Sequence, residues 1–561
     1  MDSRWTEEDA ARCDTELALR AYSSRLLGRD PALVLLGGGN TSIKLKDIAG
    51  ADVLYVKGTG ADLAKATARD FTPLRLTPVR KLLRIERMDN TTMMRELAAH
   101  ITVAGARRPS IETLLHAALP APYVEHTHAD SILAVTNTTG GIGLAEKVFG
   151  DIAIVVPYHH SGFALAKACA EAWQARAKPS TIGIVLMHHG AVACGDSART
   201  SYENMLRLVT RAEDYLHGRG AGSAPMASPP PLDETRARDV AMLRRDISRA
   251  AGYPLLLTRS EDPVCTAFAL RTDLDALALE SPATPQHAVF ARRLPMLGRD
   301  VQAYTVAYSR YLRQIPGAAD RLDAAPRIVL DPELGLLAAG ITPWHLNAAA
   351  IVYRHTIDTI LNASAHAHYA GLPPRAVLEA ELEYGGIERR IATQRPPSAS
   401  LAGTVVLLAP SLGAFLKPAA SVLLARGAAV LGFGTHADDS DVGSGFLALG
   451  DANPACLSQA LVKAIGRFGG IDTLACTAGD RELAERVLPW LRLSPATPRV
   501  VVVALDGRAH AVRTMLDNAF GEAGIKVTKV NASAFASPMH AAQAVARVVA
   551  VRPVYSFPDF N

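Results

Sequence analysis

The sequence predicts an α/β protein with two α/β regions, the second of which is a doubly wound parallel sheet. The chain has 561 residues, 49% of them hydrophobic and 20% charged, which is enough to bury cores in roughly two to four domains. In the first part of the chain, short apolar runs are mixed with stretches of helical spacing. After residue 401, strand and helix patterns alternate, which favours parallel strands covered by helices on both faces.

Two small-residue and proline-rich stretches, 218–232 and 395–400, separate the expected domains. They divide the chain into 1–217, 233–395 and 401–561. In the first part the expected strands are Ala32–Leu36, Val53–Val56, Tyr123–Glu125, Ile152–Val156 and Thr181–Met187, and the clearest helices are Ile111–Leu119 and Ser201–Leu216. The middle part is expected to be mostly helical, with helices at Leu346–Ala363 and Ala376–Ile391.

The third part gives the most regular pattern. Its expected elements, in order, are Thr404–Leu408, Ala419–Ala425, Ala428–Phe433, Leu457–Phe468, Thr473–Cys476 and Val500–Ala504. Because apolar strands alternate with helices, a Rossmann-like sheet is expected here.

Composition narrows the class of protein. Lys and Arg exceed Asp and Glu by only 59 − 55 = 4, so we expect neither a nucleic-acid nor a membrane partner. The 6 cysteines include no CxxC pair, which fits a reducing compartment. The start of the chain has no apolar signal segment, and the longest uncharged run, Leu401–Leu416, is too short to cross a bilayer. A cytoplasmic protein is therefore expected.

Histidines provide the first candidate site. His126 and His128 are two residues apart at a strand, so their imidazoles point to the same side. His189 follows another strand directly and supplies a third imidazole, and His159 and His160 are further candidates. Three neutral imidazoles leave one position open on a zinc ion, as in catalytic sites. Histidines on strands are also ordinary polar residues, so the spacing leaves both readings open.

Two glycine-rich turns and one helix start surround these histidines in the sequence. Gly37–Ser42 and Lys57–Gly60 each follow a strand, where backbone N–H groups and Lys44 or Lys57 can hold a phosphate or a carboxylate. Tight turns without a ligand have the same composition. In Pro109–Glu112, Ser110 is expected to cap a helix and Glu112 to lie in its first turn.

Five motifs then occur in a recognisable order: Gly39–Ser42, Lys57–Gly60, Pro109–Glu112, His126–His128 and His188–Gly190. This order resembles the class II aldolases of the fuculose-phosphate and rhamnulose-phosphate type, which have the aldolase/adducin fold. Looser motifs at Pro157–Tyr158, Gly162–Ala166, Pro282–His287, Tyr353–Thr356 and Glu381–Tyr384 look like the longer bifunctional branch, in which a short-chain dehydrogenase module follows the aldolase region.

The resemblance implies roles for particular residues. His126, His128 and His189 would bind Zn²⁺ or another divalent metal, and Glu112 would shuttle the proton. The residues implied around the substrate phosphate are Asn40, Ser42, Thr59, Gly60 and Ser110. A divalent metal would stabilise the enediolate of retro-aldol cleavage, and a nearby carboxylate would move the proton. A homo-oligomer is implied as well.

The resulting expectation is a zinc-dependent class II aldolase that cleaves a sugar or sugar phosphate. A sugar-phosphate epimerase or decarboxylase would use the same metal site, because function depends on the site and not on the fold. A bifunctional aldolase and dehydrogenase is a third reading. A non-catalytic, adducin-like scaffold is the fourth, and it predicts that the metal ligands are missing, whereas all of them are present.

The C-terminal region resembles short-chain dehydrogenases in its strands but lacks their cofactor residues. The three fingerprint glycines fall on Pro410, Ala414 and Leu416, whose side chains would crowd a pyrophosphate. The place of the acidic ribose partner is Gly434, and the only tyrosine after residue 400 is Tyr555, which has Asp559 four positions later in place of a lysine. NAD(P) binding and dehydrogenase activity are therefore not expected, and the region is expected to serve in packing, oligomerisation or binding of another ligand.

Overall fold

The computed structural model describes residues 1–222, 224–433, 445–450, 454–477, 479–504, 525–532, 535 and 537–550. The chain forms two compact units, and neither is a continuous stretch of sequence. The first consists of Met1–Ala224, Glu280–Ala288 and His355–Ala380, and the second of Pro225–Leu279, Val289–Arg354 and Glu381–Asn561. The expected boundaries 1–217, 233–395 and 401–561 stay predictions.

A mixed seven-stranded sheet forms the centre of the first unit. Its strands are β1 (Asn40–Lys46), β2 (Asp52–Lys57), β3 (Phe71–Arg75), β4 (Tyr123–Thr127), β5 (Ala153–Val156), β6 (Gly183–Leu186) and β7 (Gly190–Gly195). They lie in the order β3-β2-β1-β4-β7-β6-β5. Only β5 and β6 pair in parallel, and the other neighbours are antiparallel. Strand β4 therefore lies in the middle of the sheet.

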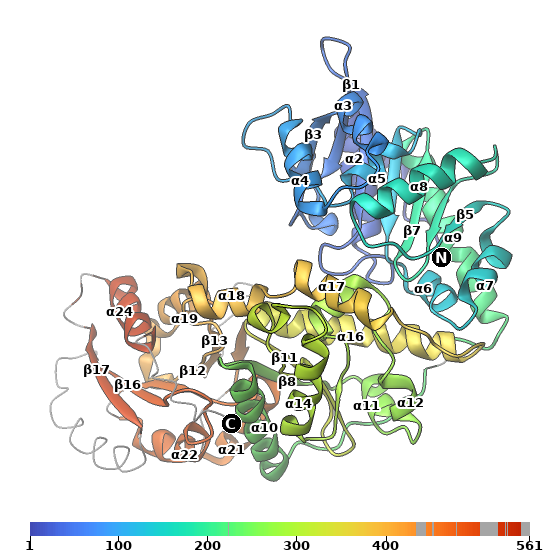
Figure 1. Cartoon of the computed structure of the whole chain (residues 1–561). Helices are drawn as coiled ribbons and strands as arrows, with labels where there is room; N and C mark the ends of the chain where they lie inside the picture. The colour runs from blue at the N-terminus through green and yellow to red at the C-terminus, as the bar shows by residue number, and fades with distance from the viewer. Residues whose placement is uncertain are drawn as a thin grey trace. The chain divides into compact units, whose positions relative to one another are not determined.

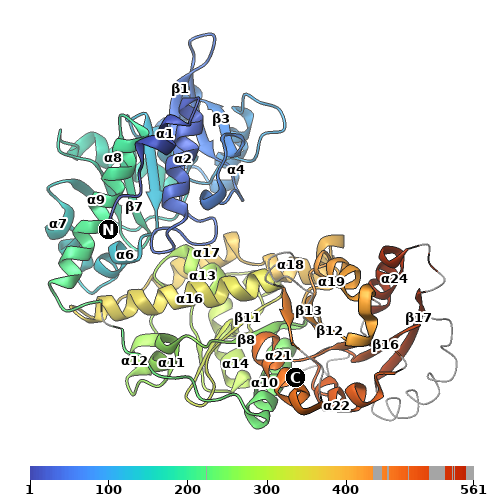
Figure 2. The same cartoon turned by 180° about the vertical axis from the view of Figure 1, so that it is seen from behind.

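Helices cover both faces of this sheet (Figures 1 and 2). Helices α2 (Glu16–Gly28), α6 (Asp130–Thr136), α7 (Gly141–Phe149) and α9 (Ala198–His217) share one core with it. Helices α3 (Leu76–Lys81), α4 (Asn90–Ala99), α5 (Thr113–Ala118) and α8 (Phe163–Arg176) share the core on the other face, while α1 (Glu7–Ala11) is short and has no buried residue. In β5, Val155 belongs to the first core and Ile154 to the second, as the period-two alternation of a strand requires.

A buried ion pair fixes the central strand β4 to its helices. The guanidinium of Arg20 on α2 lies 2.6 Å from the carboxylate of Glu125, and both side chains are fully buried. The hydroxyl of Ser201 on α9 also donates to this carboxylate, at 2.8 Å. Because neighbouring strand residues point to opposite faces, this pairing of Glu125 directs His126 to the other side of the sheet.

The middle of the chain forms a small sheet and a group of helices in the second unit. Its strands β8 (Leu256–Arg259), β9 (Met296–Leu297), β10 (Ile328–Asp331) and β11 (Gly335–Gly340) have the order β8-β11-β10-β9. The helices along this stretch of chain are α10 (Glu234–Ala251), α11 (Pro263–Ala269), α12 (Leu274–Ala278), α13 (Pro285–Ala291), α14 (Val301–Leu312), α15 (Ala318–Arg321), α16 (Pro343–Ser364), α17 (Pro374–Tyr384) and α18 (Ile387–Gln394). Parts of α13, α16 and α17 belong to the first unit.

The C-terminal region is a six-stranded parallel sheet with a doubly wound order. Its strands β12 (Val405–Leu408), β13 (Ala429–Gly432), β14 (Phe446–Ala448), β15 (Thr473–Cys476), β16 (Arg499–Ala504) and β17 (Lys526–Asn531) have the order β14-β13-β12-β15-β16-β17, and every pairing is parallel. This order, which starts from the central β12 and winds outward in both directions, is that of the Rossmann fold.

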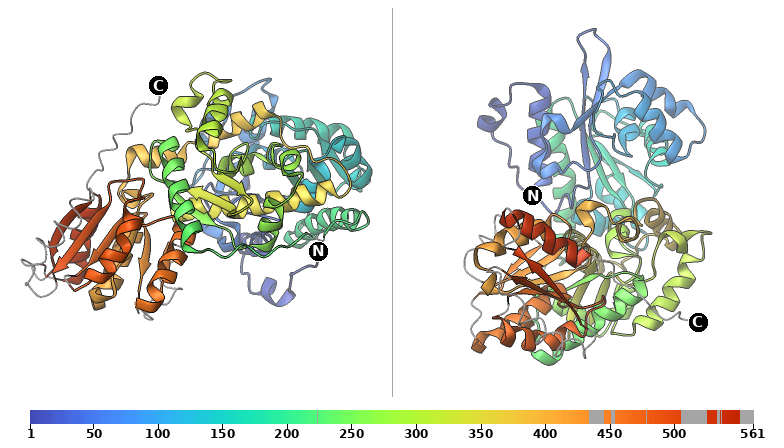
Figure 3. Two further views of the ribbon diagram at one scale, coloured as in Figure 1. Left: turned by 90° about the horizontal axis from the view of Figure 1, so that it is seen from below. Right: turned by 90° about the vertical axis from the view of Figure 1, so that its left-hand side faces the viewer.

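Helices lie on both faces of this sheet too, as Figure 3 shows in orange and red. Helices α19 (Leu416–Leu424) and α24 (Pro538–Ala550) share the core on one face, and α21 (Pro454–Phe468) and α22 (Arg481–Leu491) share the core on the other. Val405 and Leu407 of β12 enter one core, whereas Val406 and Leu408 enter the other. The expectation of an α/β protein with a Rossmann-like C-terminal domain is therefore confirmed.

Two local expectations were wrong. The apolar run Ala32–Leu36 is not a strand, because the N–H groups of Leu33 and Val34 bond to the carbonyl of Asp30 and close local turns. The expected helix Ala376–Ile391 is broken at Gly385–Gly386, where Gly386 has a φ of 58°. The middle region contains the small sheet β8–β11 in addition to its helices.

Among the described residues, no helix combines the length and the apolar character that a bilayer crossing requires.

Candidate metal centre

Three imidazoles converge at one end of the central strand β4. His126 is on β4, His128 follows the end of this strand, and His189 lies in the tight turn between β6 and β7. One ring nitrogen of each lies within 4.8 Å of those of the other two. Nitrogen ligands on a tetrahedral zinc ion are about 3.3 Å apart when the bonds are about 2.0 Å long. The spacing is therefore that of a site for one cation.

The hydrogen bonds of the rings set where their protons lie. The Nδ1 atom of His126 is 3.0 Å from the carbonyl oxygen of Ala191, and since a carbonyl only accepts, this nitrogen carries the proton. The Nδ1 atom of His128 is 2.7 Å from Oε1 of Gln286. The Nε2 atoms of His126 and His128 then face each other at 3.1 Å, each with a lone pair toward the centre of the group.

Glu112 completes the group from the start of α5. Its carboxylate lies 3.1 Å from Nε2 of His189 and 3.4 Å from Nε2 of His126, and it accepts a hydrogen bond of 2.5 Å from the Asn40 amide. Burial alone would raise the pKa of Glu112, but His126, His189 and His128 hold this pKa well below its ordinary value. Glu112 is therefore an ionised carboxylate beside three imidazoles.

Burial acts in the opposite direction on the imidazoles. It lowers the pKa of His126 and, more strongly, that of His128, where the neighbouring rings add to the effect. Neutral imidazoles are the form that binds a metal ion. Burial thus favours neutral rings at His126 and His128, while the Asn40 amide and the hydrogen bond with His189 favour the ionised form of Glu112.

A glycine allows His189 to approach the other two rings. Gly190 has a φ of 145°, and a Cβ atom there would lie 2.1 Å from the carbonyl oxygen of Thr127. Any other residue would push β7 away from β4, where Ala191 pairs with Thr127. The turn also places His188 at a φ of 55°, in the left-handed region that L-residues rarely adopt.

The residues expected around a phosphate divide into three groups. Asn40 and Ser110 are at the carboxylate of Glu112, because the Asn40 amide also donates to the Ser110 hydroxyl at 3.3 Å. Ser42 is fully buried and bonds to His116 at 2.8 Å, so it lies behind the centre. Thr59 and Gly60 are exposed in a turn, which the Thr59 hydroxyl ties to the carbonyl of Pro109 at 2.9 Å.

Some sequence expectations at the site need correction. Ser110 does not cap α5, since the residue that precedes its first helical residue is Glu112. The Ser110 hydroxyl instead accepts from the Glu112 N–H at 3.2 Å. His159 and His160 are not members of the converging group of three.

The two lysines near the glycine turns are engaged with the protein itself. Lys57 donates from Nζ to the carbonyls of Gly37 at 2.7 Å and Ala61 at 3.0 Å, and burial lowers its pKa to about 8. Lys44 donates to the carbonyl of Ala121 at 2.5 Å, and burial lowers its pKa to about 7. Lys57 therefore holds the glycine turn Gly37–Gly39 in place through its hydrogen bond to the carbonyl of Gly37.

Comparisons with known protein families match most of the chain. Residues 19–216 match the family model described as the class II aldolase and adducin N-terminal domain, and residues 234–390 match that of the aldolase class II second domain. The chain belongs to the class II aldolase and adducin family.

The chain is similar to three further proteins of known sequence or structure. An uncharacterized oxidoreductase of Bacillus subtilis (strain 168) is 28% identical over 454 residues, which are 76% of this chain and 65% of that protein. The N-terminal class II aldolase domain of a conserved protein from Thermoplasma acidophilum is 37% identical and covers 38% of this chain and 99% of its own, with a TM-score of 0.35. A sugar-phosphate aldolase from Thermotoga maritima is 15% identical and covers 37% of this chain and 97% of its own, with a TM-score of 0.29.

Two residues at the centre escaped the sequence analysis. His116 bridges the side chains of Asn40 and Ser42 through its two ring nitrogens. It lies four residues after Glu112, a helical spacing that could have indicated a shared face. Gln286, which contacts His128, lies in the Pro282–His287 motif and in the match to the second domain of the class II aldolases, but the motif alone gives Gln286 no role at this centre.

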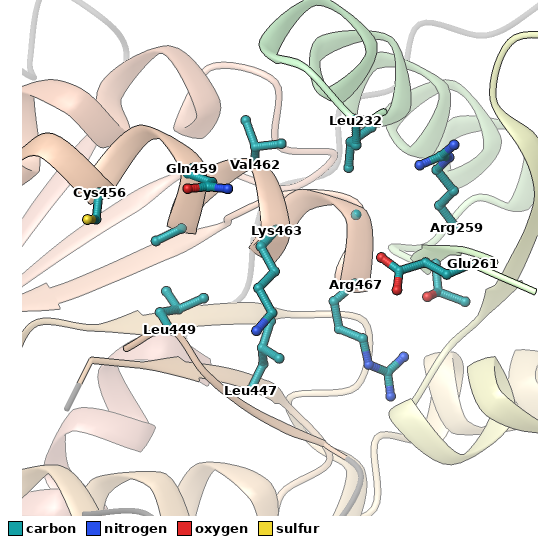
Figure 4. Close-up of a pocket in the computed structure, with 13 residues that line it drawn as sticks. Leu232, Arg259, Glu261, Leu447, Leu449, Cys456, Gln459, Val462, Lys463 and Arg467 are labelled. Atoms are coloured by element: carbon teal, nitrogen blue, oxygen red, sulfur yellow. The ribbon is translucent and has the colours of Figure 1, made fainter. Parts of the chain in front are cut away.

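A separate cavity of about 660 Å³ lies in the second unit between β8 and α21 (Figure 4). Arg259, Glu261, Lys463 and Arg467 are its charged lining residues. None of the residues expected in the aldolase site belongs to it. The candidate metal centre is thus a compact polar cluster that is separate from this cavity.

In the C-terminal sheet, the segment after β12 departs from a dinucleotide-binding turn. Pro410–Phe415 forms a 3₁₀ helix, and Leu416 begins α19. The proline and the leucine therefore occupy positions where the fingerprint has glycines. Gly434, Tyr555 and Asp559, on which other parts of the comparison with dehydrogenases rest, lie outside the described residues.

The buried position of His116 predicts an acid-sensitive stability. Burial lowers the pKa of His116 well below its ordinary value, whereas the unfolded chain titrates near pH 6.5. Below that pH the unfolded state binds a proton that the folded state does not, so the contribution of His116 to stability is present above about pH 6.5 and declines as the pH falls.

We expect the free energy of unfolding of His116→Gln to fall less between pH 7.5 and pH 5.5 than that of the wild type, because its unfolding takes up as much as one proton fewer. Urea unfolding at the two pH values measures this. His217→Gln, at an exposed histidine, is the matched control and should retain the wild-type dependence. An unchanged pH dependence in His116→Gln would contradict the prediction.

Proposed function

We propose that this class II aldolase family member is a divalent-metal-dependent lyase that breaks a carbon–carbon bond in a sugar or sugar phosphate. The observation that carries the proposal is the pair of Nε2 atoms of His126 and His128, 3.1 Å apart. With a proton already on Nδ1 of each ring, two lone pairs face each other there. A cation between them removes this repulsion, and His189 offers the third nitrogen.

In this proposal His126, His128 and His189 hold the cation, with zinc as the first choice because three imidazoles and an open position suit it. When bound, the cation supplies a Lewis acid that stabilises the negative charge developing during bond cleavage. The imidazoles stay neutral because burial lowers the pKa of His126 and His128. A fourth position is left for the substrate.

Glu112 is the proposed proton carrier. The Asn40 amide and the hydrogen bond with His189 stabilise its ionised form, so it can accept a proton from the substrate and return it. Asn40 donates to one carboxylate oxygen at 2.5 Å and keeps the other turned toward His189 at 3.1 Å. The carboxylate thus stays next to the position where charge develops.

The proposed substrate-binding groups are in the turns around the three imidazoles. In the glycine turn Gly37–Gly39 and the exposed turn Thr59–Gly60, the N–H groups of Gly38 and Thr59 already donate to the carbonyls of Leu35 and Arg108, so the other N–H groups of these turns are the ones proposed to hold a phosphate or carboxylate. We infer a small sugar-derived substrate held by these groups and by Ser110. A homo-oligomer and the absence of nucleic-acid partners also belong to this proposal.

Removal of one histidine should abolish metal binding. We expect His128→Ala to lose most of the zinc that copurifies with or is loaded into the wild type, because two imidazoles hold zinc far more weakly than three. Elemental analysis of the purified protein measures this, and His217→Ala is the control at an exposed histidine. Full zinc retention in His128→Ala would show that the ligands are wrongly assigned.

A product screen tests the reaction. The zinc-loaded protein is incubated with a panel of ketose 1-phosphates and sugar acids, and we expect an aldehyde together with dihydroxyacetone phosphate or another enolisable fragment. Glu112→Gln should keep the metal but lower kcat by ~10²-fold or more, the scale of a positioned acid–base group. Glu171→Gln, at an exposed position of α8, is the control. If carbon dioxide or an epimer were the only product, the proposed cleavage would be wrong and the reaction would be a decarboxylation or an epimerisation.

We infer that the C-terminal sheet does not carry out the hydride transfer of short-chain dehydrogenases. Pro410 and Leu416 support this, because their side chains and the 3₁₀ turn take the space that a pyrophosphate needs. The relative in Bacillus subtilis is called an oxidoreductase, which makes the point worth testing. We expect no micromolar binding of NADH or NADPH to the full chain by fluorescence titration, and saturable binding in that range would overturn the inference.

A further inference from the structure

A stretch of the class II aldolase second-domain match is built into the first unit. Residues Glu280–Ala288 belong to that unit, and several backbone groups hold them in place. The amide of Asn137 donates to the carbonyl of Ala283 at 2.7 Å, the Tyr369 hydroxyl donates to that of Ser281 at 3.0 Å, and the N–H of Leu372 donates to that of Pro282 at 3.0 Å. Gln286 at the start of α13 is therefore presented from an anchored segment.

The amide of Gln286 can take only one orientation there. Its Nε2 atom donates to the carbonyl of Leu35 at 2.8 Å, which leaves Oε1 to face Nδ1 of His128 at 2.7 Å. Because Oε1 is an acceptor, Nδ1 of His128 must carry the proton. Nε2 of His128 then has its lone pair free and directed toward His126 and His189.

The same amide rests on the glycine turn. A Cβ atom at Gly38 would lie 2.6 Å from both Nε2 and Oε1 of Gln286, so the absence of a side chain at Gly38 is what lets the amide reach His128. On its other side the turn is held by Lys57, which donates to the carbonyl of Gly37. Gln286 thus links the ring of His128 to the position of this turn.

We propose that Gln286 is a positioning residue that fixes the tautomer and the orientation of His128, so that the metal centre is completed by a residue of the second-domain match. This inference rests on the metal site of the proposed function. Hydrogen-bonding partners of metal-binding histidines typically contribute 10–100-fold in metal affinity or activity. The bond from Gln286 Nε2 to Leu35 makes the glycine turn part of the same arrangement.

The first test measures zinc affinity of the full chain by competition with a chromophoric chelator. We expect Gln286→Ala to weaken zinc binding by about 10–100-fold, with the melting temperature of the metal-free protein unchanged. Gln286→Glu keeps an acceptor for the His128 proton and should recover most of the lost affinity. Gln302→Ala, at an exposed glutamine of the same second-domain match, is the matched control and should bind zinc as the wild type does.

The second test approaches Gln286 from the glycine turn. Gly38 has no positive φ, so alanine is compatible with its backbone, but the added methyl group would displace the flexible end of Gln286. We expect Gly38→Ala to weaken zinc binding although Gly38 makes no contact with the imidazoles. In the Gln286→Ala background the same substitution should have little further effect, because the two changes act through one contact.

The outcomes separate the two proposals. If the wild type binds zinc and Gln286→Ala binds it equally well, the role of Gln286 is wrong and the metal site stands. Additive effects of Gly38→Ala and Gln286→Ala would also contradict the link through Gly38. If the wild type itself binds no zinc or other divalent metal, the proposed function fails, and the inference about Gln286 fails with it.

Discussion

The repulsion between unprotonated nitrogens is the constraint on which the centre of this protein depends. His126 and His128 present their Nε2 atoms to each other at 3.1 Å, in a region where burial disfavours protonation of either ring. Glu112 supplies a negative charge beside them. In the proposed function a bound cation supplies the positive charge between these nitrogens and the carboxylate, because protonating a buried imidazole is costly.

The fold meets this constraint by placing its rigid elements around β4. The strand lies in the middle of the sheet, and its neighbouring residue Glu125 is fixed to Arg20 on the opposite face. A buried carboxylate that lost this partner would destabilise the unit by about 3–5 kcal/mol. The alternation of side chains along one strand therefore separates a structural charge, Glu125, from a functional ring, His126.

Much of this centre was predictable from the sequence, and what escaped has a physical reason. The period-two spacing of His126 and His128 indicated a common side of a strand, and the turn after an apolar strand pointed to His189. Gln286 is 158 residues away from His128, so no local pattern relates them. The run Ala32–Leu36 was wrongly predicted as a strand because any buried segment can be apolar, whether or not it is a strand. In the structure the N–H groups of Leu33 and Val34 bond to the carbonyl of Asp30 and form turns.

The two remaining sheets also differ in how far the sequence predicted them. Much of the C-terminal sheet was predictable because β12, β13, β15 and β16 are buried apolar strands and helices follow β12 and β15, so the alternation indicates the topology. The small sheet β8–β11 was not, because β9 has only two residues and β8 pairs with β11 rather than with the next strand. Long-range pairing of short strands leaves no periodic trace in the sequence. For the same reason the sequence does not reveal that the second-domain match contributes to the first unit. The residues that reach the candidate centre are few, and they are placed by hydrogen bonds that the Tyr369 hydroxyl, the Leu372 N–H and the Asn137 amide donate to the backbone carbonyls of Ser281, Pro282 and Ala283.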